Sequence, residues 1–390
     1  MVLLAVSCSA PRQFSREVVR SEMVRCPEAS YIDGQEGNLK WNYTTGLELK
    51  AFLDVYDNYS GRRAYKKENQ RILDYVDSWY DAVIGEDGSI YKYKRSNYST
   101  DHICPGRTLF RLYDITGKEK YRMAMDTLYR QIQEQPRTPE GGFWHKKIYP
   151  DQMWLDGLYM AQPFYAEYTV RYVADDRKAA NFADIALQFR TVYEHTYDPA
   201  TGLLRHAWDS SHEMFWCDPQ TGQSKHAWGR AMGWYAMALV DVIDIMPESP
   251  ERDELIDIFN RLMDSIKSYS EKSSFMWYQV IDSPGRDGNY LEATCSAMFV
   301  YALLKGTRLG ILHNYSADTA RRYYVKMLQS FVRLDKDGNI NLNSCCEVAG
   351  LGGKQNRSGD YDYYINEPVR PNDPKGMGPL IWAALEMENR

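Results

Sequence analysis

One theme recurs along the sequence, in which a glycine-containing turn leads through a short aromatic or extended piece into an apolar helix. It occurs as EDGSIYKYK before DHICPGRTLFRLY, PEGGFWHKKIYPDQ before MWLDGLYMAQPF, ATGLLRHAWDSS ahead of HAWGRAMGWYAMALV, and PGRDGNY before LEATCSAMFVYALL. The helical parts of successive copies begin about 50 to 75 residues apart, with one helix pair for each step. A chain with this repeat is expected to wind its helix pairs around a ring.

Helical periodicity with turn punctuation predicts about twelve helices. Their ranges are 14–25, 43–59, 64–84, 101–116, 118–135, 151–171, 175–196, 226–246, 251–271, 290–309, 315–332 and 376–389. Strand signals are short, near 89–94, 143–149 and 339–349. Six helix pairs predict an all-α fold, an (α/α)6 barrel or six-hairpin toroid, with a few short strands in loops at its mouth. Polar residues that begin the inner helices would meet at that mouth.

No linker or low-complexity segment divides the chain, so residues 31–390 are expected to form a single domain. Residues 1–30 are interpreted as a signal remnant or leader and the first helix region. The start MVLLAVSCSA resembles the end of a bacterial lipoprotein signal, which makes Cys8 a possible lipid anchor and the periplasm the expected location. The alternative is a short apolar tail on a cytoplasmic protein. No apolar run approaches the ~20 residues of a transmembrane helix.

Composition narrows the class of ligand. The net charge of -6 leaves no basic surface for nucleic acid or for an anionic membrane. The chain has 31 Tyr and 10 Trp, which fits either a large aromatic core or the binding of sugar rings. The seven cysteines show no spacing typical of a zinc site, and no phosphate-binding glycine loop is present, so neither a metal nor a cofactor is expected.

The stretch MWLDGLYMAQPFYAEY, residues 153–168, contains a single aspartate, Asp156, in a run that is apolar, aromatic or small on nearly every side. This pattern predicts a helix that is buried almost all round. A carboxylate in such a helix is either an acid that caps the helix or accepts backbone N–H groups, or an acid with a chemical role. Both interpretations remain open from this stretch alone.

Other polar residues lie near the predicted starts of the inner helices. They are Asp101, His145, His206, Trp228 and Arg230. Two carboxyl groups in one pocket disfavour each other's ionisation, so one of a pair can stay protonated and act as an acid. Taken singly, the histidines and tryptophans are more often structural. Arg230 is costly to bury without an anion, which predicts a carboxylate partner from the protein or from an acidic substrate.

Four separated motifs resemble one known family. MWLDGLYMAQPF, GLLRHAWD, HAWGRAMGWYAMALVDVID and the C-terminal CEVAGLGG with GDYDYYINEPVRPNDPKGMGPLIWAALEME are similar to the unsaturated rhamnogalacturonyl hydrolases, glycoside hydrolase family 105. The resemblance runs from about residue 35 to the end and extends to the unsaturated glucuronyl hydrolases of family 88. It implies an (α/α)6 catalytic domain that removes a 4,5-unsaturated uronic acid from the non-reducing end of lyase-generated oligosaccharides.

The resemblance also implies roles for individual residues. Asp156 corresponds to the catalytic acid, and Asp101 to a second aspartate. Substrate contacts carry over to Tyr43, His145, His206, Trp228 and Arg230. Relatives more often have Gly-Asn after the arginine, so Ala231 and Met232 are a departure that bears on the subsite beyond the uronate.

Two other functions are compatible with the same residues. An ordinary glycosidase would use Asp101 and Asp156 as paired carboxylates on saturated substrates. A non-catalytic glycan-binding lipoprotein would use the aromatic side chains to bind sugar and the acids only as hydrogen-bond acceptors. The sequence does not distinguish galacturonic from glucuronic acid as the source of the uronate, or identify the next sugar.

Overall fold

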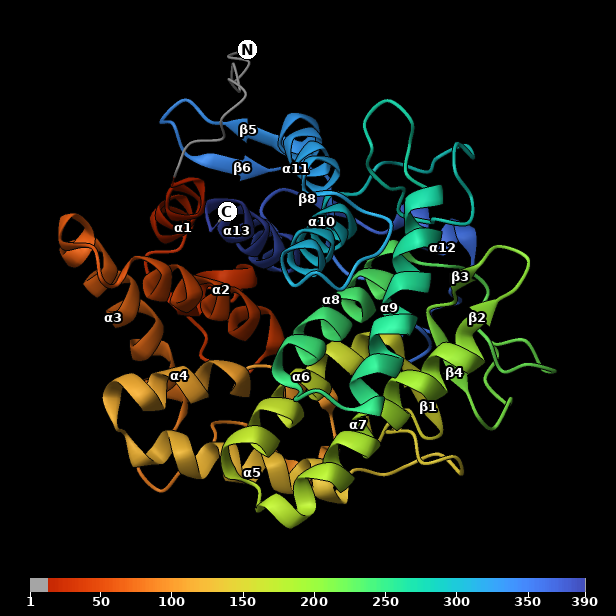
Figure 1. Cartoon of the computed structure of the whole chain (residues 1–390), viewed down its shortest axis with the longest axis horizontal. Helices are drawn as coiled ribbons and strands as arrows, with labels where there is room; N and C mark the ends of the chain where they lie inside the picture. Colours follow the sequence, from red (N-terminus) through yellow and green to blue (C-terminus); the bar gives the residue numbers. More distant parts are fainter. Residues whose placement is uncertain (1–12, 390) are drawn as a thin grey trace.

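The computed structural model describes residues 13–389, and the expected leader and Cys8 lie outside these described residues. Six inner helices form a closed ring in which each helix contacts the next. In ring order they are α2 (Tyr43–Tyr59), α4 (Gly106–Thr116), α6 (Leu155–Tyr172), α8 (Gly229–Ile245), α10 (Ala293–Arg308) and α13 (Pro374–Glu388). The (α/α)6 barrel predicted from the repeat is confirmed (Figure 1).

An outer helix packs on each inner helix. These are α1 (Phe14–Arg25), α3 (Lys66–Val83), α5 (Glu119–Glu134), α7 (Asp175–Thr196), α9 (Pro250–Ser268) and α11 (Ala317–Phe331). The pair of α1 and α13 joins opposite ends of the chain, and the Ser15 hydroxyl donates to Glu388 over 2.6 Å. The outer and inner helices of this pair therefore come from the two ends of the described chain, whereas contact between α13 and α2 closes the inner ring.

Burial explains which helices lie inside. Every residue of α8 from Gly229 to Ile243 is buried, because the sequence GRAMGWYAMALVDVI offers no polar face. The outer helix α3 buries one stripe, which includes Ile72, Val76 and Trp79, and exposes its charged residues. The contrast between α8 and α3 thus shows how an apolar helix takes an inner position and an amphipathic helix covers it, although the inner helix α4 also leaves Arg111 and Asp114 unburied.

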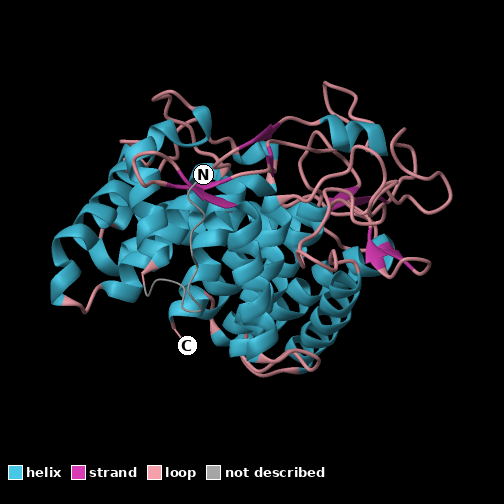
Figure 2. Cartoon of the chain, turned by 90° about the horizontal axis from the view of Figure 1, so that it is seen from above, coloured by secondary structure: helices cyan, strands magenta, loops and turns pink. Residues whose placement is uncertain are grey.

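The short strands and long loops gather at one end of the helices (Figure 2). β1 (Gln152–Trp154) pairs with β4 (Ala207–Asp209) in antiparallel register, with Trp154 opposite Ala207. β7 (Cys345–Cys346) pairs with β8 (Val369–Arg370), and the short helix α12 (Tyr361–Asn366) lies between these two strands in the sequence. Two further hairpins join β2 (Tyr197–Asp198) to β3 (Leu203–Leu204) and β5 (Val332–Leu334) to β6 (Ile340–Leu342).

Several predicted boundaries were wrong. The helix expected from residue 151 begins at Leu155, because residues 152–154 pair with β4 instead. The helix expected from residue 101 begins at Gly106, after a 3-10 turn at Thr100–His102. Segments 89–94 and 143–149 are turns with isolated bridges, whereas 339–349 does contain β6 and β7.

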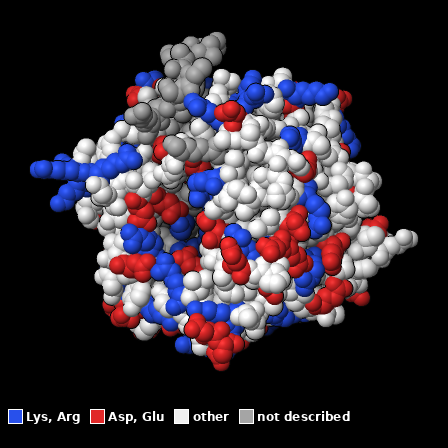
Figure 3. Space-filling view, viewed as in Figure 1, with Lys and Arg blue, Asp and Glu red and all other residues white. Residues whose placement is uncertain are grey.

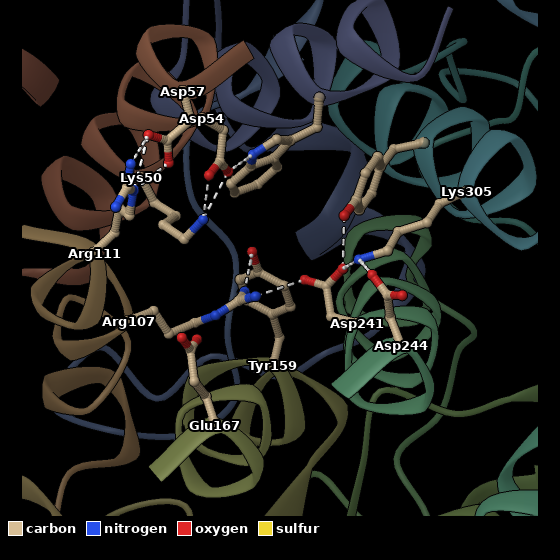
Figure 4. A network of polar contacts seen from close by, with 12 residues as sticks. Lys50, Asp54, Asp57, Arg107, Arg111, Tyr159, Glu167, Asp241, Asp244 and Lys305 are labelled. Atoms are coloured by element: carbon tan, nitrogen blue, oxygen red, sulfur yellow. Dashed lines mark hydrogen bonds and ion pairs between the residues drawn. The ribbon is translucent and has the colours of Figure 1, made fainter. Parts of the chain in front are cut away.

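A network of charged side chains from several inner helices meets inside the barrel, where Asp241 and Lys305 lie in the C-terminal halves of α8 and α10 (Figure 4). Asp241 on α8 accepts from Arg107 over 3.0 Å and from Lys305 over 2.9 Å. The hydroxyl of Tyr301 also donates to Asp241, over 2.6 Å. The end of the barrel opposite the loops is therefore crossed by buried ion pairs.

On the face seen in Figure 3, acidic and basic side chains are interspersed. Among the described residues, no helix is long and apolar enough to cross a membrane.

Candidate active site

The inner helices begin at the loop-bearing end of the barrel, which we call the mouth. Each sequence-predicted site residue lies at the start of an inner helix or in the segment that leads to one. Tyr43, Asp156 and Arg230 belong to the first turns of α2, α6 and α8, and Trp228 is the residue before α8. Asp101 lies in the 3-10 turn before α4, whereas His145 and His206 precede β1 and β4.

Backbone hydrogen bonds hold these segments together. The His145 N–H donates to the carbonyl of Gln152 over 2.8 Å, and the His145 carbonyl accepts from Thr100 N–H over 3.1 Å. The Leu155 N–H donates to the carbonyl of His206 over 3.1 Å. The β1–β4 pairing therefore brings the two histidines and the start of α6 to one place.

Asp156 is the accessible residue at the start of a buried helix. Of residues 155–166, it alone is not buried, and its side chain is 15% exposed. Its Oδ2 lies 3.2 Å from Nε2 of His206, which is fully buried. Nδ1 of the same ring lies 2.7 Å from the hydroxyl of Tyr364 on α12. A carboxyl group, an imidazole and a phenol thus form a row at the mouth.

Asp101 belongs to a second group, together with His145 and Lys146. Lys146 Nζ lies 2.5 Å from Oδ2 of Asp101, and His145 Nε2 lies 3.7 Å from Oδ1. Burial opposes ionisation of Asp101, but Lys146 and then His145 outweigh it, so the pKa of Asp101 is lowered. Asp101 is therefore a carboxylate at neutral pH.

His145 is held as a neutral ring. Burial lowers its pKa to about 4, although Asp101 acts in the opposite direction. Its Nδ1 lies 3.1 Å from the hydroxyl of Thr100, and its face stacks on Trp154 at 4.6 Å between ring centroids. A Cβ at Gly157 would come within 3.0 Å of this Nδ1, so the glycine after Asp156 is the residue that leaves room for His145.

Arg230 is a buried cation beside an aromatic ring. It is 1% exposed, its guanidinium lies over Trp228 at 4.7 Å, and one N–H donates to the carbonyl of Cys346 over 2.5 Å. Burial favours the neutral form, but Cys346, Asp373 and other nearby groups outweigh it, so the pKa of Arg230 is raised. Arg230 is a permanent positive charge at this end of the barrel.

Tyr43 links the separate groups. Burial raises the pKa of its phenol well above the ordinary value, and Asp101 raises it further. Arg230 and Asp156 also act on the Tyr43 phenol, in opposite directions. The pKa of the Tyr43 phenol is therefore affected by the charges of both aspartates and of the arginine. These three charged groups lie in one region of the mouth, around Tyr43.

A cavity of about 360 Å³ opens beside this region. Its lining includes Tyr43, Asp101 and His102, together with the charged residues Lys40, Glu347 and Arg370. A second wall of the mouth is aromatic, because Tyr149 stacks on Trp154 at 5.0 Å. The glycine-rich loop at 350–353 packs on this wall, since a Cβ at Gly350 would lie 3.6 Å from Trp154.

Sequence reasoning missed three side chains of the site. Lys146 pairs with Asp101, Tyr364 contacts His206, and Gln279 accepts from the Trp228 indole over 3.1 Å. The motif HKKIYP placed Lys146 beside His145, but the expected strand there would have pointed neighbouring side chains to opposite faces. No local signal singled out Tyr364 or Gln279.

Some residues near these motifs serve the loops instead. Trp208 stacks on His195 at 3.7 Å, and the buried Asp209 accepts the N–H groups of Glu213 and Met214. His226 lies 3.3 Å from Asp282. Within residues 13–389, no group of three or more His, Cys, Asp or Glu side chains is arranged to hold a metal ion.

Known glycoside hydrolases are similar to this chain in both sequence and fold. The sequence model of Glycosyl Hydrolase Family 88 matches residues 14–390. A solved glycoside hydrolase of family 105 from C. acetobutylicum is 42% identical, with a TM-score of 0.89 over 97% of this chain and 100% of its own. The 24.9 kDa protein in the picA locus of Rhizobium radiobacter is 40% identical over 209 residues, which are 52% of this chain and 89% of that protein.

A more distant structure shares the fold. The unsaturated glucuronyl hydrolase from Bacillus sp. GL1 is 11% identical, with a TM-score of 0.64 over 95% of this chain and 94% of its own. At that identity the similarity concerns the arrangement of helices alone.

Proposed function

Because the chain belongs to glycosyl hydrolase family 88, and is therefore a glycoside hydrolase, we propose that it removes a 4,5-unsaturated uronic acid from the non-reducing end of lyase-generated oligosaccharides. We propose further that the uronate derives from galacturonic acid and is linked to rhamnose. The main support for this proposal is the position of Asp156. Its partly exposed carboxyl group lies at the start of a buried helix, 3.2 Å from the buried imidazole of His206.

Hydration of the substrate double bond needs only one acidic side chain. A 4,5-unsaturated uronide is an enol ether, so a proton delivered to C4 produces a cation at C5 that the ring oxygen stabilises. In the proposed reaction Asp156 gives that proton, an assistance that typically contributes ~10²–10⁴-fold. Water then adds at C5 and loses its proton to the Asp156 carboxylate. The resulting hemiketal opens, and the glycosidic bond is lost.

The remaining residues bind the uronate ring in this proposal. Arg230 supplies a permanent positive charge for the substrate carboxylate, and Trp228 supplies the ring next to it. Asp101 is ionised and already paired with Lys146, so it suits hydrogen bonds from ring hydroxyls better than proton donation. In this proposal Arg230, Trp228 and Asp101 bind the substrate, and Asp156 alone acts as the acid.

The test follows the ultraviolet absorbance of the double bond. Purified protein is incubated with the unsaturated uronyl-rhamnose disaccharide that a lyase releases from a galacturonic acid-containing polysaccharide. It is incubated in parallel with the unsaturated uronyl-rhamnose disaccharide released from a glucuronic acid-containing polysaccharide, and with saturated galacturonyl-rhamnose. Wild type is expected to remove the absorbance of the first substrate and to release rhamnose from it. Asp156→Asn is expected to lose at least about 10²-fold in kcat, in line with the loss of a general acid.

Asp244→Asn is the matched control, because Asp244 pairs with Lys305 at the opposite end of the barrel. It is expected to retain wild-type kinetics. Release of rhamnose from the saturated disaccharide would replace the proposal with an ordinary glycosidase. The unsaturated rings derived from galacturonic and glucuronic acid are identical, because elimination removes the stereocentre at C4. Hydrolysis of the second disaccharide alone would therefore keep the reaction and change the linkage to rhamnose that the site accepts.

A further inference from the structure

Tyr364 is brought to His206 from a distant part of the sequence. The phenol hydroxyl lies 2.7 Å from Nδ1 of His206, although 158 residues separate them. Tyr364 is fully buried and stacks on Trp228 at 5.8 Å with an interplanar angle of 21°. Its helix, α12, is capped by Asp360, whose side chain accepts from the Tyr363 N–H. The hydroxyl is therefore held firmly against one nitrogen of the imidazole.

The direction of this hydrogen bond follows from burial. Burial raises the pKa of the Tyr364 phenol well above its ordinary value, so the phenol keeps its proton. Within the described residues, His206 Nδ1 is the one hydrogen-bond partner of the hydroxyl, and a buried hydroxyl proton without an acceptor is costly. The hydroxyl thus donates to Nδ1, and a neutral imidazole then carries its own proton on Nε2.

Nε2 of His206 faces the carboxyl group of Asp156 over 3.2 Å. The two atoms are close but not aligned as a hydrogen bond, and within residues 13–389 neither has another hydrogen-bond partner. Catalytic hydrogen bonds are often poorly aligned before substrate binds and tighten in the reacting complex. The available partner of the Nε2 proton is therefore Asp156.

We propose that Tyr364 is a positioning residue of the reaction: it fixes the tautomer of His206, so that the Nε2–H stabilises the negative charge that develops on Asp156. As the proton of Asp156 passes to C4 of the substrate, the carboxyl becomes a carboxylate and its hydrogen bond from Nε2 strengthens. No proton moves on the imidazole or on the phenol. This inference rests on the proposed function, since it assigns Asp156 as the acid.

The tautomer is read directly by NMR of protein labelled with ¹⁵N-histidine, because a protonated and a bare ring nitrogen have well-separated chemical shifts. His206→Asn identifies the His206 signals by their loss. Wild type is expected to carry the proton on Nε2. Tyr364→Phe keeps the ring that stacks on Trp228 and is expected to show a mixture of tautomers. A wild-type proton on Nδ1 overturns the inference, as does an unchanged tautomer in Tyr364→Phe.

Kinetics give the second readout. Tyr364→Phe is expected to lower kcat about tenfold or more, because the charge on Asp156 loses a preorganised donor, and to change KM by less than about threefold. Tyr363→Phe is the matched control. It removes a hydroxyl from the same helix that accepts from Gly350 N–H over 3.0 Å and makes no hydrogen bond to His206. The control is expected to keep the wild-type tautomer and kcat.

The outcomes separate this inference from the proposed function. Turnover of the unsaturated disaccharide by a wild type with the Nδ1–H tautomer removes the inference alone. Lack of turnover on every unsaturated uronide removes the proposed function and this reaction step with it, whatever the tautomer. Equal loss of kcat in Tyr364→Phe and Tyr363→Phe overturns the inference, because it assigns the effect to the fold of α12.

Discussion

Lys146 Nζ lies 2.5 Å from Oδ2 of Asp101, beside His145, and lowers the pKa of this aspartate despite its burial. From the sequence, Asp101 and Asp156 were expected to disfavour each other's ionisation. That expectation did not include the ammonium group of Lys146. Lys146 neutralises the charge of Asp101, so the two aspartates of the mouth differ in their surroundings. Asp101 faces an ammonium group, and Asp156 faces an imidazole.

Replacement of Lys146 by methionine should therefore reduce activity. Without the ammonium, the partly buried Asp101 loses the largest influence that lowers its pKa, so its pKa should rise, because burial is then opposed by His145 and His102 only. We expect kcat/KM on the unsaturated disaccharide to fall about 10- to 100-fold, which corresponds to ~1.4–2.8 kcal/mol. Steady-state kinetics at pH 7 check this. Lys146→Arg, which retains the charge, should keep more activity, and an unaltered Lys146→Met would show that the pair is dispensable.

His145 should make the protein sensitive to acid. Its pKa is lowered to about 4 in the fold, from an ordinary value of 6.5, because burial disfavours the charged ring. Between these two values the unfolded chain binds the proton more readily, so stability falls as pH decreases from 6.5 through 4. His145 contributes a slope of up to ~1.4 kcal/mol per pH unit in this range.

Urea denaturation across this pH range measures the effect. His145→Gln should have a flatter stability curve between pH 6.5 and 4 than wild type. His313→Gln, a change at an exposed histidine, should follow the wild-type curve. Parallel curves for wild type and His145→Gln would contradict the prediction.

The barrel could be predicted because its signals are local. Helices such as α8 are apolar on all sides, and glycine-containing turns mark their starts, so ring position and helix type follow from short windows of sequence. The same signals predicted that Asp101, Asp156 and Arg230 come together, since each lies at the start of an inner helix or in the segment that leads to one.

The contacts between side chains of the site could not be predicted from short stretches of sequence. β1 and β4 pair across more than 50 residues, and a three-residue strand has too few positions to show an alternating pattern. Tyr364 is one of 31 tyrosines and lies on a six-residue helix between two loops. Its partner is known only once α12 is folded against His206.

A buried acid pair near the N-terminal helix should limit stability at neutral pH. Glu48 on α2 is 1% exposed, Glu22 on α1 is 4% exposed, and one oxygen of Glu48 has no hydrogen-bond partner in the described part of the chain. Burial raises the pKa of both carboxyl groups above the ordinary value of 4.5. The fold therefore holds protons that the unfolded chain releases, and stability is lost as pH rises above 4.5.

Glu48→Gln should relieve this cost, because an amide carries no charge at any of these pH values. We expect the variant to be more stable than wild type at pH 7–8 by about 1–2 kcal/mol, with a gain that shrinks as pH falls toward 4.5. Thermal and urea unfolding at several pH values provide the measurement. A gain that is independent of pH would point to packing rather than to ionisation of Glu48.

Asp241 should be among the most important side chains for stability, because it is the common acceptor of the network at the far end of the barrel (Figure 4). Arg107, Lys305 and Asp241 itself are all largely buried, and the two cations lower the pKa of Asp241 despite that burial. Asp241→Asn leaves two buried cations without their shared anion, which typically costs 3–5 kcal/mol. Asp244→Asn removes the other acidic partner of Lys305, but Asp244 is 36% exposed, so its loss should cost less than about 1 kcal/mol. Urea unfolding of both variants at pH 7 compares these costs, and equal costs would show that burial does not determine the strength of this network.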